Sequence, residues 1–398
     1  MNSLRTRTFG LILVCPLTLT AVLASAPSAA AGVSLPISLT VKATADSETL
    51  LPNSKRMKLI SRGVPAFASS GNARAANSGE YRSGWRSAGV PATLTYDLSS
   101  VPAANRQSIY LVWYNDASYP YDHGMSGGPG YNNVGAYTIE VNSAPGRGQP
   151  PESGWQTVES VANNTLHSRD HVIKFAGYNW VRLNATATDG TTQNYDISID
   201  MDVYDASSGV NDGWFFFGDS ITANCMGHWT TPESENFISR VGARTGVFPA
   251  EQNAGMPFWT TGEGLKHLRT MLGQFHGLYV TIALGTNDAA GNANPDGFYS
   301  DLQKLVGEIL EVGKIPVVPT IPWSRDATHA KSIPALNDEI RKLYKTNSRV
   351  IPGADLYELF SKHQEYISQD NVHPSKEGCL AMRTQWADAA VASVYAIK

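Results

Sequence analysis

The sequence predicts a mixed α/β protein with two parts, an all-β domain over residues 33–205 and a doubly wound α/β domain over residues 214–398. In the first part, short segments alternate apolar with polar residues between Gly, Pro, Asn and Ser, which is typical of half-buried strands. In the second part, continuous apolar runs alternate with stretches whose apolar residues recur every three or four positions. A length of 398 residues also suits two domains.

Residues 1–31 have the pattern of a secretory signal peptide. Arg5 and Arg7 precede the apolar run 9–14, and small residues end the stretch. The alternative is an uncleaved membrane anchor, but a span needs about 20 apolar residues, and Pro16 interrupts a shorter run. We therefore expect a secreted protein, extracellular or periplasmic, with no membrane insertion.

The strands of the all-β domain are expected where β-branched and aromatic residues alternate with polar ones, at residues 92–98, 108–114, 136–141 and 179–184. These short strands predict a β-sandwich or jelly roll. The turn-rich segment 206–213 is the expected linker. After it, the apolar runs 214–217, 278–284 and 315–319 predict buried parallel strands, and residues 298–310 predict an amphipathic helix between two of them.

Charge and cysteine content limit the partners. Removing Arg5 and Arg7 from the 31 basic residues leaves 29 against 35 acidic residues, a net charge near −6, which argues against a nucleic-acid partner. Only Cys225 and Cys379 remain after the signal peptide, so an oxidising exterior predicts either one disulfide or two buried free thiols.

Three residues have the chemistry of acyl transfer by a serine. Gly218-Asp219-Ser220 directly follows the apolar run 214–217, so Ser220 is expected at the sheet edge where doubly wound folds bind ligands. Asp370 and His373 lie three residues apart near the end of the chain. An attacking serine needs an imidazole to take its proton and a carboxylate to orient that imidazole. Alone, a serine after a strand is more simply a helix N-cap.

Four sequence blocks together resemble the SGNH (GDSL-like) hydrolase family. They are Gly218-Asp219-Ser220-Ile221-Thr222, Asn253-Ala254-Gly255, Gly285-Thr286-Asn287-Asp288 and Asp370-Asn371-Val372-His373-Pro374. They occur in the family's order and span nearly all of the α/β domain, for which the resemblance implies a three-layer, flavodoxin-like fold. No Gly-x-Ser-x-Gly elbow surrounds Ser220, which disfavours the α/β-hydrolase fold.

The resemblance implies a role for each matching residue. Ser220 is the expected nucleophile, His373 the general base, and Asp370 the residue that orients the imidazole. The expected oxyanion hole consists of the backbone N–H groups of Ser220 and Gly255 and the side-chain amide of Asn287. This mechanism needs no cofactor, and the other histidines are scattered without ligand spacing, so we expect no metal site.

The substrate prediction is a carbohydrate ester, most simply an O-acetyl group on a polysaccharide. It rests on a resemblance of the N-terminal half to galactose-binding-like jelly rolls, through residues 72–76, 83–87 and 92–98. Trp259, Trp323 and Tyr121 are candidate substrate contacts, and each has a packing role as its alternative. Other readings are a short-chain lipid esterase, lysophospholipase or thioesterase, and, in another class, a catalytically silent carbohydrate-binding protein.

Overall fold

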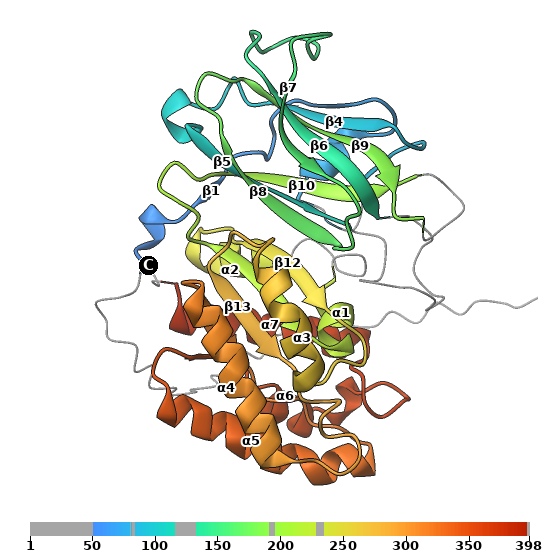
Figure 1. Cartoon of the computed structure of the whole chain (residues 1–398), viewed down its shortest axis with the longest axis vertical. Helices are drawn as coiled ribbons and strands as arrows, with labels where there is room; N and C mark the ends of the chain where they lie inside the picture. Colours follow the sequence, from blue (N-terminus) through green and yellow to red (C-terminus); the bar gives the residue numbers. More distant parts are fainter. Residues whose placement is uncertain are drawn as a thin grey trace, which may run out of the picture. The chain divides into compact units, whose positions relative to one another are not determined.

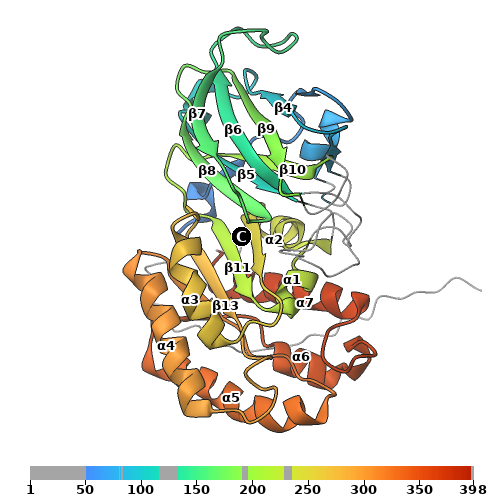
Figure 2. The ribbon, with the colours of Figure 1, turned by 45° about the vertical axis from the view of Figure 1, so that its right-hand side comes forward.

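The computed structural model describes residues 51–79, 81, 84–115, 133–190, 196–227 and 235–395. These residues belong to one compact unit (Figures 1 and 2). The predicted signal peptide and the candidate contact Tyr121 lie outside the described residues. Over the part of the chain that is described, no helix is long and apolar enough to cross a membrane.

The N-terminal region contains two antiparallel sheets. One sheet has the order β1 (Lys58–Leu59), β10 (Ser198–Asp205), β5 (Ser108–Tyr114) and β8 (Ser168–Lys174), with β3 (Trp85–Arg86) also paired to β10. The other has the order β2 (Ala66–Ala68), β4 (Ala92–Asp97), β9 (Trp180–Thr188), β6 (Val134–Asn142) and β7 (Gln156–Val161). Buried side chains from both sheets, including Leu111, Trp113, Ile139 and Leu183, form one core, as in a β-sandwich.

The C-terminal region contains a five-stranded parallel sheet. Its order is β12 (Ala250–Gly255), β11 (Gly213–Gly218), β13 (Tyr279–Ala283), β14 (Ile315–Val318) and β15 (Ile351–Pro352). This is the strand order of flavodoxin-like sheets, in which the chain adds its second strand on one side of the first and then crosses back to add the third on the other side. The predicted three-layer fold is confirmed.

Helices cover both faces of the parallel sheet, as Figures 1 and 2 show. Side chains of α3 (Thr261–Leu272), α4 (Pro295–Glu311) and α5 (Ala327–Thr346) pack with Phe215 and Phe217 of β11. Side chains of α1 (Ser220–Cys225), α2 (Phe237–Thr245), α6 (Leu356–Lys362) and α7 (Lys376–Ser393) pack on the opposite face, with Trp214 and Phe216. Strand β11 is therefore apolar at successive positions because both of its faces are buried.

The predicted linker 206–213 is packed against both regions. Asp212 is fully buried and accepts hydrogen bonds from Arg56, 3.3 Å away, and from the hydroxyl of Tyr395, 2.7 Å away. Asn211 contacts the backbone of Met57. The proposed domain boundaries stay a prediction, and this junction is not a loose connection.

Candidate active site

Ser220 lies where β11 passes into α1, at the carboxyl edge of the parallel sheet. Asp219, the preceding residue, caps the helix, because its carboxylate accepts a hydrogen bond from the N–H of Ile221 at 2.9 Å. Ser220 is the first residue of α1, where backbone N–H groups have no acceptor inside the helix. Its amide is therefore available to an external acceptor, such as a developing oxyanion.

The structure brings together the three residues that the sequence analysis selected for acyl transfer. The hydroxyl oxygen of Ser220 lies 2.9 Å from Nε2 of His373, although 153 residues separate them. Nδ1 of His373 lies 2.7 Å from a carboxylate oxygen of Asp370. A carboxylate at Nδ1 holds the proton on that nitrogen and leaves Nε2 free to accept the hydroxyl proton of Ser220.

Asp370 stays ionised because its own loop surrounds it with donors. Partial burial acts to raise the pKa of Asp370, but hydrogen bonds from the N–H groups of Val372 and His373, from the His373 ring and from the Ser368 hydroxyl outweigh it. The pKa of Asp370 is held well below its usual range. A permanent negative charge therefore faces the imidazole at neutral pH.

The loop that carries Asp370 and His373 is fastened by the segment after β14. The carbonyl of Asn371 accepts hydrogen bonds from the hydroxyl of Ser324 at 2.8 Å and from the N–H groups of Arg325 and Asp326 at 2.9 and 3.1 Å. The Arg325 guanidinium donates to the carbonyl of Gln364 at 2.6 Å and contacts the Asn371 side chain at 3.3 Å. Asn371 has a φ of 68°, a left-handed conformation that asparagine tolerates better than most residues.

The predicted oxyanion donors reach the same edge of the sheet. Parallel pairing places Gly255, the last residue of β12, beside Gly218. A Cβ at Gly255 would lie 2.2 Å from the backbone nitrogen of Ala223, so the position requires glycine. The Gly255 N–H donates to the side chain of Asn253 at 3.0 Å. Asn287 donates to the carbonyl of Trp259 at 2.9 Å, which leaves one amide hydrogen for a ligand.

The two tryptophans predicted as substrate contacts lie in packed surroundings. The Trp259 ring stacks on His267 at 4.7 Å between ring centres and meets Phe217 edge-on. Trp323 packs against the core on the α7 side of the sheet. Both are only partly buried, and their role as substrate contacts stays a prediction.

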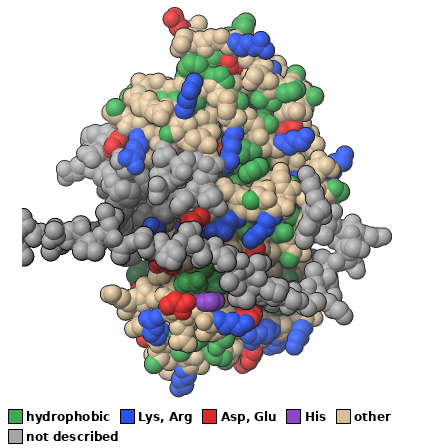
Figure 3. Space-filling model, turned by 180° about the vertical axis from the view of Figure 1, so that it is seen from behind, with side chains coloured by type: hydrophobic (Ala, Val, Ile, Leu, Met, Phe, Trp, Pro, Cys, Tyr) green, Lys and Arg blue, Asp and Glu red, His purple; other side chains and the backbone are tan. Residues whose placement is uncertain are grey.

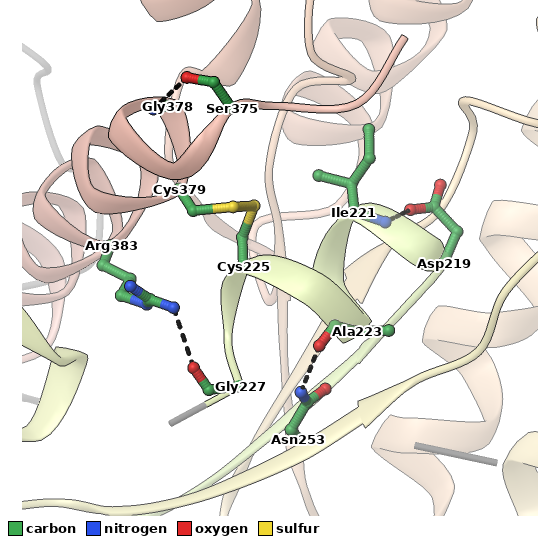
Figure 4. The surroundings of a disulfide bond; sticks show 10 residues. All are labelled: Asp219, Ile221, Ala223, Cys225, Gly227, Asn253, Ser375, Gly378, Cys379 and Arg383. Atoms are coloured by element: carbon green, nitrogen blue, oxygen red, sulfur yellow. Dashed lines mark hydrogen bonds between the residues drawn. A yellow bond between two sulfur atoms is a disulfide. The ribbon is translucent and has the colours of Figure 1, made fainter. Parts of the chain in front are cut away.

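A disulfide joins the helix that begins with Ser220 to the helix that follows His373. Cys225 in α1 and Cys379 in α7 are bonded, which is the first of the two alternatives that the sequence left open, and Figure 4 shows the bond among the neighbouring residues. The cross-link closes 154 residues and therefore removes chain entropy from the unfolded state, by about 5 kcal/mol in the loop-closure account. It also ties together the two elements that bring the hydroxyl and the imidazole into contact.

On the face drawn in Figure 3, Lys and Arg side chains are dispersed among Asp and Glu side chains. In the described ranges, no group of three His, Cys, Asp or Glu side chains is arranged to hold a metal ion.

Comparison with known proteins defines the class. Residues 216–380 match the GDSL-like Lipase/Acylhydrolase family, so this part of the chain is a GDSL-like hydrolase domain and the expected resemblance is confirmed there. The class of enzyme is accordingly an ester hydrolase. No curated protein matches the chain.

Several solved structures are similar to a part of this chain. A lipase/acylhydrolase from Enterococcus faecalis is 25% identical, with a TM-score of 0.38, and the match covers 45% of this chain and 95% of that chain. The esterase EstA from a Pseudoalteromonas species is 17% identical, with a TM-score of 0.37 and coverage of 45% and 96%. Axe2, an acetylxylan esterase from Geobacillus stearothermophilus, is 17% identical, with a TM-score of 0.37 and coverage of 46% and 94%.

Proposed function

We propose that the protein is a secreted serine esterase that hydrolyses short-chain esters, O-acetyl groups on carbohydrate in particular. The observation that carries the proposal is the continuous contact from the Ser220 hydroxyl through the His373 ring to the Asp370 carboxylate. Nucleophilic catalysis needs this order of groups, because the imidazole takes the proton of the serine and the carboxylate holds the imidazole in the orientation that allows it.

The proposed reaction runs through an acyl-enzyme. The Ser220 oxygen attacks the ester carbonyl while His373 takes the proton of the Ser220 hydroxyl. His373 then gives that proton to the leaving alcohol. Water activated by His373 releases the acid from Ser220. The oxyanion would accept hydrogen bonds from the N–H of Ser220, from the remaining amide hydrogen of Asn287, and from the N–H of Gly255 in exchange for its bond to Asn253. Each such donor is typically worth about 2.7–4 kcal/mol of the barrier.

The carbohydrate part of the proposal rests on the N-terminal region. Its antiparallel sheets pack as a β-sandwich, which agrees with the predicted resemblance to galactose-binding-like jelly rolls. A short-chain lipid esterase or thioesterase is the alternative that uses the same acyl-transfer chemistry. A carbohydrate-binding protein without catalytic activity is the alternative from another class.

Hydrolysis of p-nitrophenyl esters from acetate to palmitate tests the function, with the mature protein beside Ser220→Ala. We expect activity that is highest on acetate and falls steeply with acyl length. Ser220→Ala should lose at least about 1000-fold, because removing the nucleophile removes the covalent route. Ser393→Ala is the matched control and should keep full activity, because the Ser393 hydroxyl donates to the carbonyl of Ala389 within α7. A maximum at long chains would favour the lipid reading, and turnover that does not depend on Ser220 would overturn the proposal.

A further inference from the structure

Phe258 is exposed and strained at the same time. Among the large hydrophobic side chains that the structure describes, its exposed fraction of 73% is the highest, followed by 44% for Val312 and 39% for Val172. Its φ of 68° lies in the left-handed region, where a Cβ is close to the following carbonyl oxygen. Glycine or asparagine would occupy such a turn at lower cost. Neither packing nor turn chemistry therefore explains a phenylalanine here.

The turn that carries Phe258 is bound to the candidate active site on both sides. Before it, the N–H of Met256 donates to the carbonyl of Gly218, two residues before Ser220, at 2.9 Å. After it, the carbonyl of Trp259 accepts from the side chain of Asn287 at 2.9 Å. Within the turn, the N–H of Trp259 bonds to the carbonyl of Met256 at 3.3 Å. The backbone of the turn that carries the exposed ring is thus tied to the segments that would supply the nucleophile and an oxyanion donor.

We propose that Phe258 is a specificity-determining residue whose ring stacks on the sugar ring that carries the ester. This inference rests on the proposed function and names the part of the substrate that the site recognises. Backbone strain held in place by surrounding contacts is characteristic of functional positions.

The exposure of Phe258 favours a sugar over an acyl chain. A ring that is mostly in water offers a flat apolar face, and a sugar can cover it with C–H groups while its hydroxyls stay hydrated. An acyl chain gains its binding energy from removal from water on all sides and therefore needs enclosing apolar walls. Phe258 offers one exposed aromatic face and no enclosing walls, which suits a sugar ring better than an acyl chain.

Substitutions at Phe258 separate the ring from the backbone. Phe258→Gly removes the ring and relieves the left-handed strain, whereas Phe258→Tyr keeps the ring. The probes are a methyl glycoside with one O-acetyl group and, as an ester without a ring, ethyl acetate. For Phe258→Gly we expect kcat/KM on the glycoside to fall about tenfold, mainly through KM, with ethyl acetate hydrolysis within twofold of wild type and no lower thermal midpoint. Phe258→Tyr should stay within twofold on both probes.

The controls separate this inference from the proposed function. Val312→Ala, a change at an exposed apolar residue at the end of α4, should leave both probes unaffected. An equal loss on both probes, or a larger loss on ethyl decanoate than on the glycoside, would overturn the stacking role while the esterase remains. A thermal midpoint that falls together with activity would show that Phe258 is a packing residue. If the wild-type protein hydrolyses neither the acetylated glycoside nor ethyl acetate, or if Ser220→Ala hydrolyses them equally well, the proposed function itself fails.

Discussion

At the scale of single residues, Asp219 combines a structural role with an unusual ionisation. Its carboxylate caps α1 next to Ser220, and its side chain is 1% exposed. Burial raises the pKa of Asp219 to about 6, even though hydrogen bonds from Ile221 and Thr286 and the nearby His373 oppose the rise. An ordinary aspartate has a pKa near 3.9. The folded protein thus binds more protons than the unfolded chain between about pH 4 and pH 6, and Asp219 costs stability as the pH rises through that window.

Replacing Asp219 with asparagine should remove this cost. Asparagine keeps the capping oxygen and carries no charge to desolvate. We expect Asp219→Asn to be more stable than wild type at pH 7 by about 1–3 kcal/mol, with a smaller difference near pH 4. Urea unfolding between pH 4 and pH 7.5 measures this. Asp326→Asn is the matched control, because Asp326 caps α5 from a half-exposed position where hydrogen bonding to His329 lowers its pKa. A difference in the free energy of unfolding between wild type and Asp219→Asn that stays constant from pH 4 to pH 7.5 would contradict the expectation.

At the scale of elements, the loop 368–373 depends on its neighbour for its shape. It has no regular secondary structure, and the bridge between Ile367 and Pro374 closes only its base. Arg325 reaches the loop and the segment before it with its backbone and both guanidinium nitrogens. A planar guanidinium can hold several carbonyls in a fixed arrangement, which an ammonium group does not reproduce. We infer that Arg325 positions His373 through the loop.

A change of Arg325 to lysine tests this positioning role. Lysine keeps the positive charge but cannot donate to several carbonyls in a fixed geometry as the guanidinium does. The His373 imidazole should therefore spend less time within hydrogen-bond distance of the Ser220 hydroxyl. We expect kcat to fall about 10- to 100-fold with KM within twofold, because a small misplacement of a catalytic group affects the chemical step most. Arg341→Lys, at an exposed ion pair within α5, is the control and should leave kcat unchanged. Added guanidinium should partly restore kcat of an Arg325→Ala variant. A lowered thermal midpoint with unchanged kcat would assign Arg325 to stability alone.

The elements also show what sequence patterns can and cannot predict. Strand β5 begins and ends at the predicted residues 108 and 114, because its alternation reflects one buried core. Strand β12 is not among the predicted strands, since Ala-Glu-Gln-Asn-Ala-Gly has no apolar run. Its polar side chains bond to distant partners: Gln252, which is buried, donates to Asp170, and Asn253, which is half-buried, donates to the carbonyl of Ala223. The catalytic blocks were visible in the sequence, whereas supports such as Arg325 were not, because their partners lie far along the chain.

At the scale of the whole described unit, a buried carboxylate links the antiparallel and parallel sheets. Asp170 in β8 accepts hydrogen bonds from the hydroxyl of Tyr110, from Gln252 in β12 at 2.7 Å, and from the backbone N–H of His276. The ring of His276 lies 2.5 Å from the same carboxylate. The hydrogen bond to Asp170 raises the pKa of His276, against its partial burial and the nearby Lys314. One side chain therefore binds residues from both regions.

The free energy of unfolding should consequently depend on pH through His276. Asp170 should also contribute to the contacts that make the two regions unfold together. Because the pKa of His276 is raised in the folded state, its stabilising contribution is complete below about pH 6.5 and is lost as the pH rises through the raised value. We expect Asp170→Asn to remove this pH dependence and to lower the free energy of unfolding by about 3 kcal/mol or more, because it leaves the buried donors poorly paired. Urea unfolding from pH 5.5 to 8.5, followed by tryptophan fluorescence and far-UV circular dichroism, measures both effects. His363→Gln, at an exposed histidine paired with Glu365, should change neither. A variant that unfolds in one transition with wild-type stability would show that other contacts hold the two regions together, among them the Arg56–Asp212 pair and the apolar cluster that contains Tyr204 and Ile238.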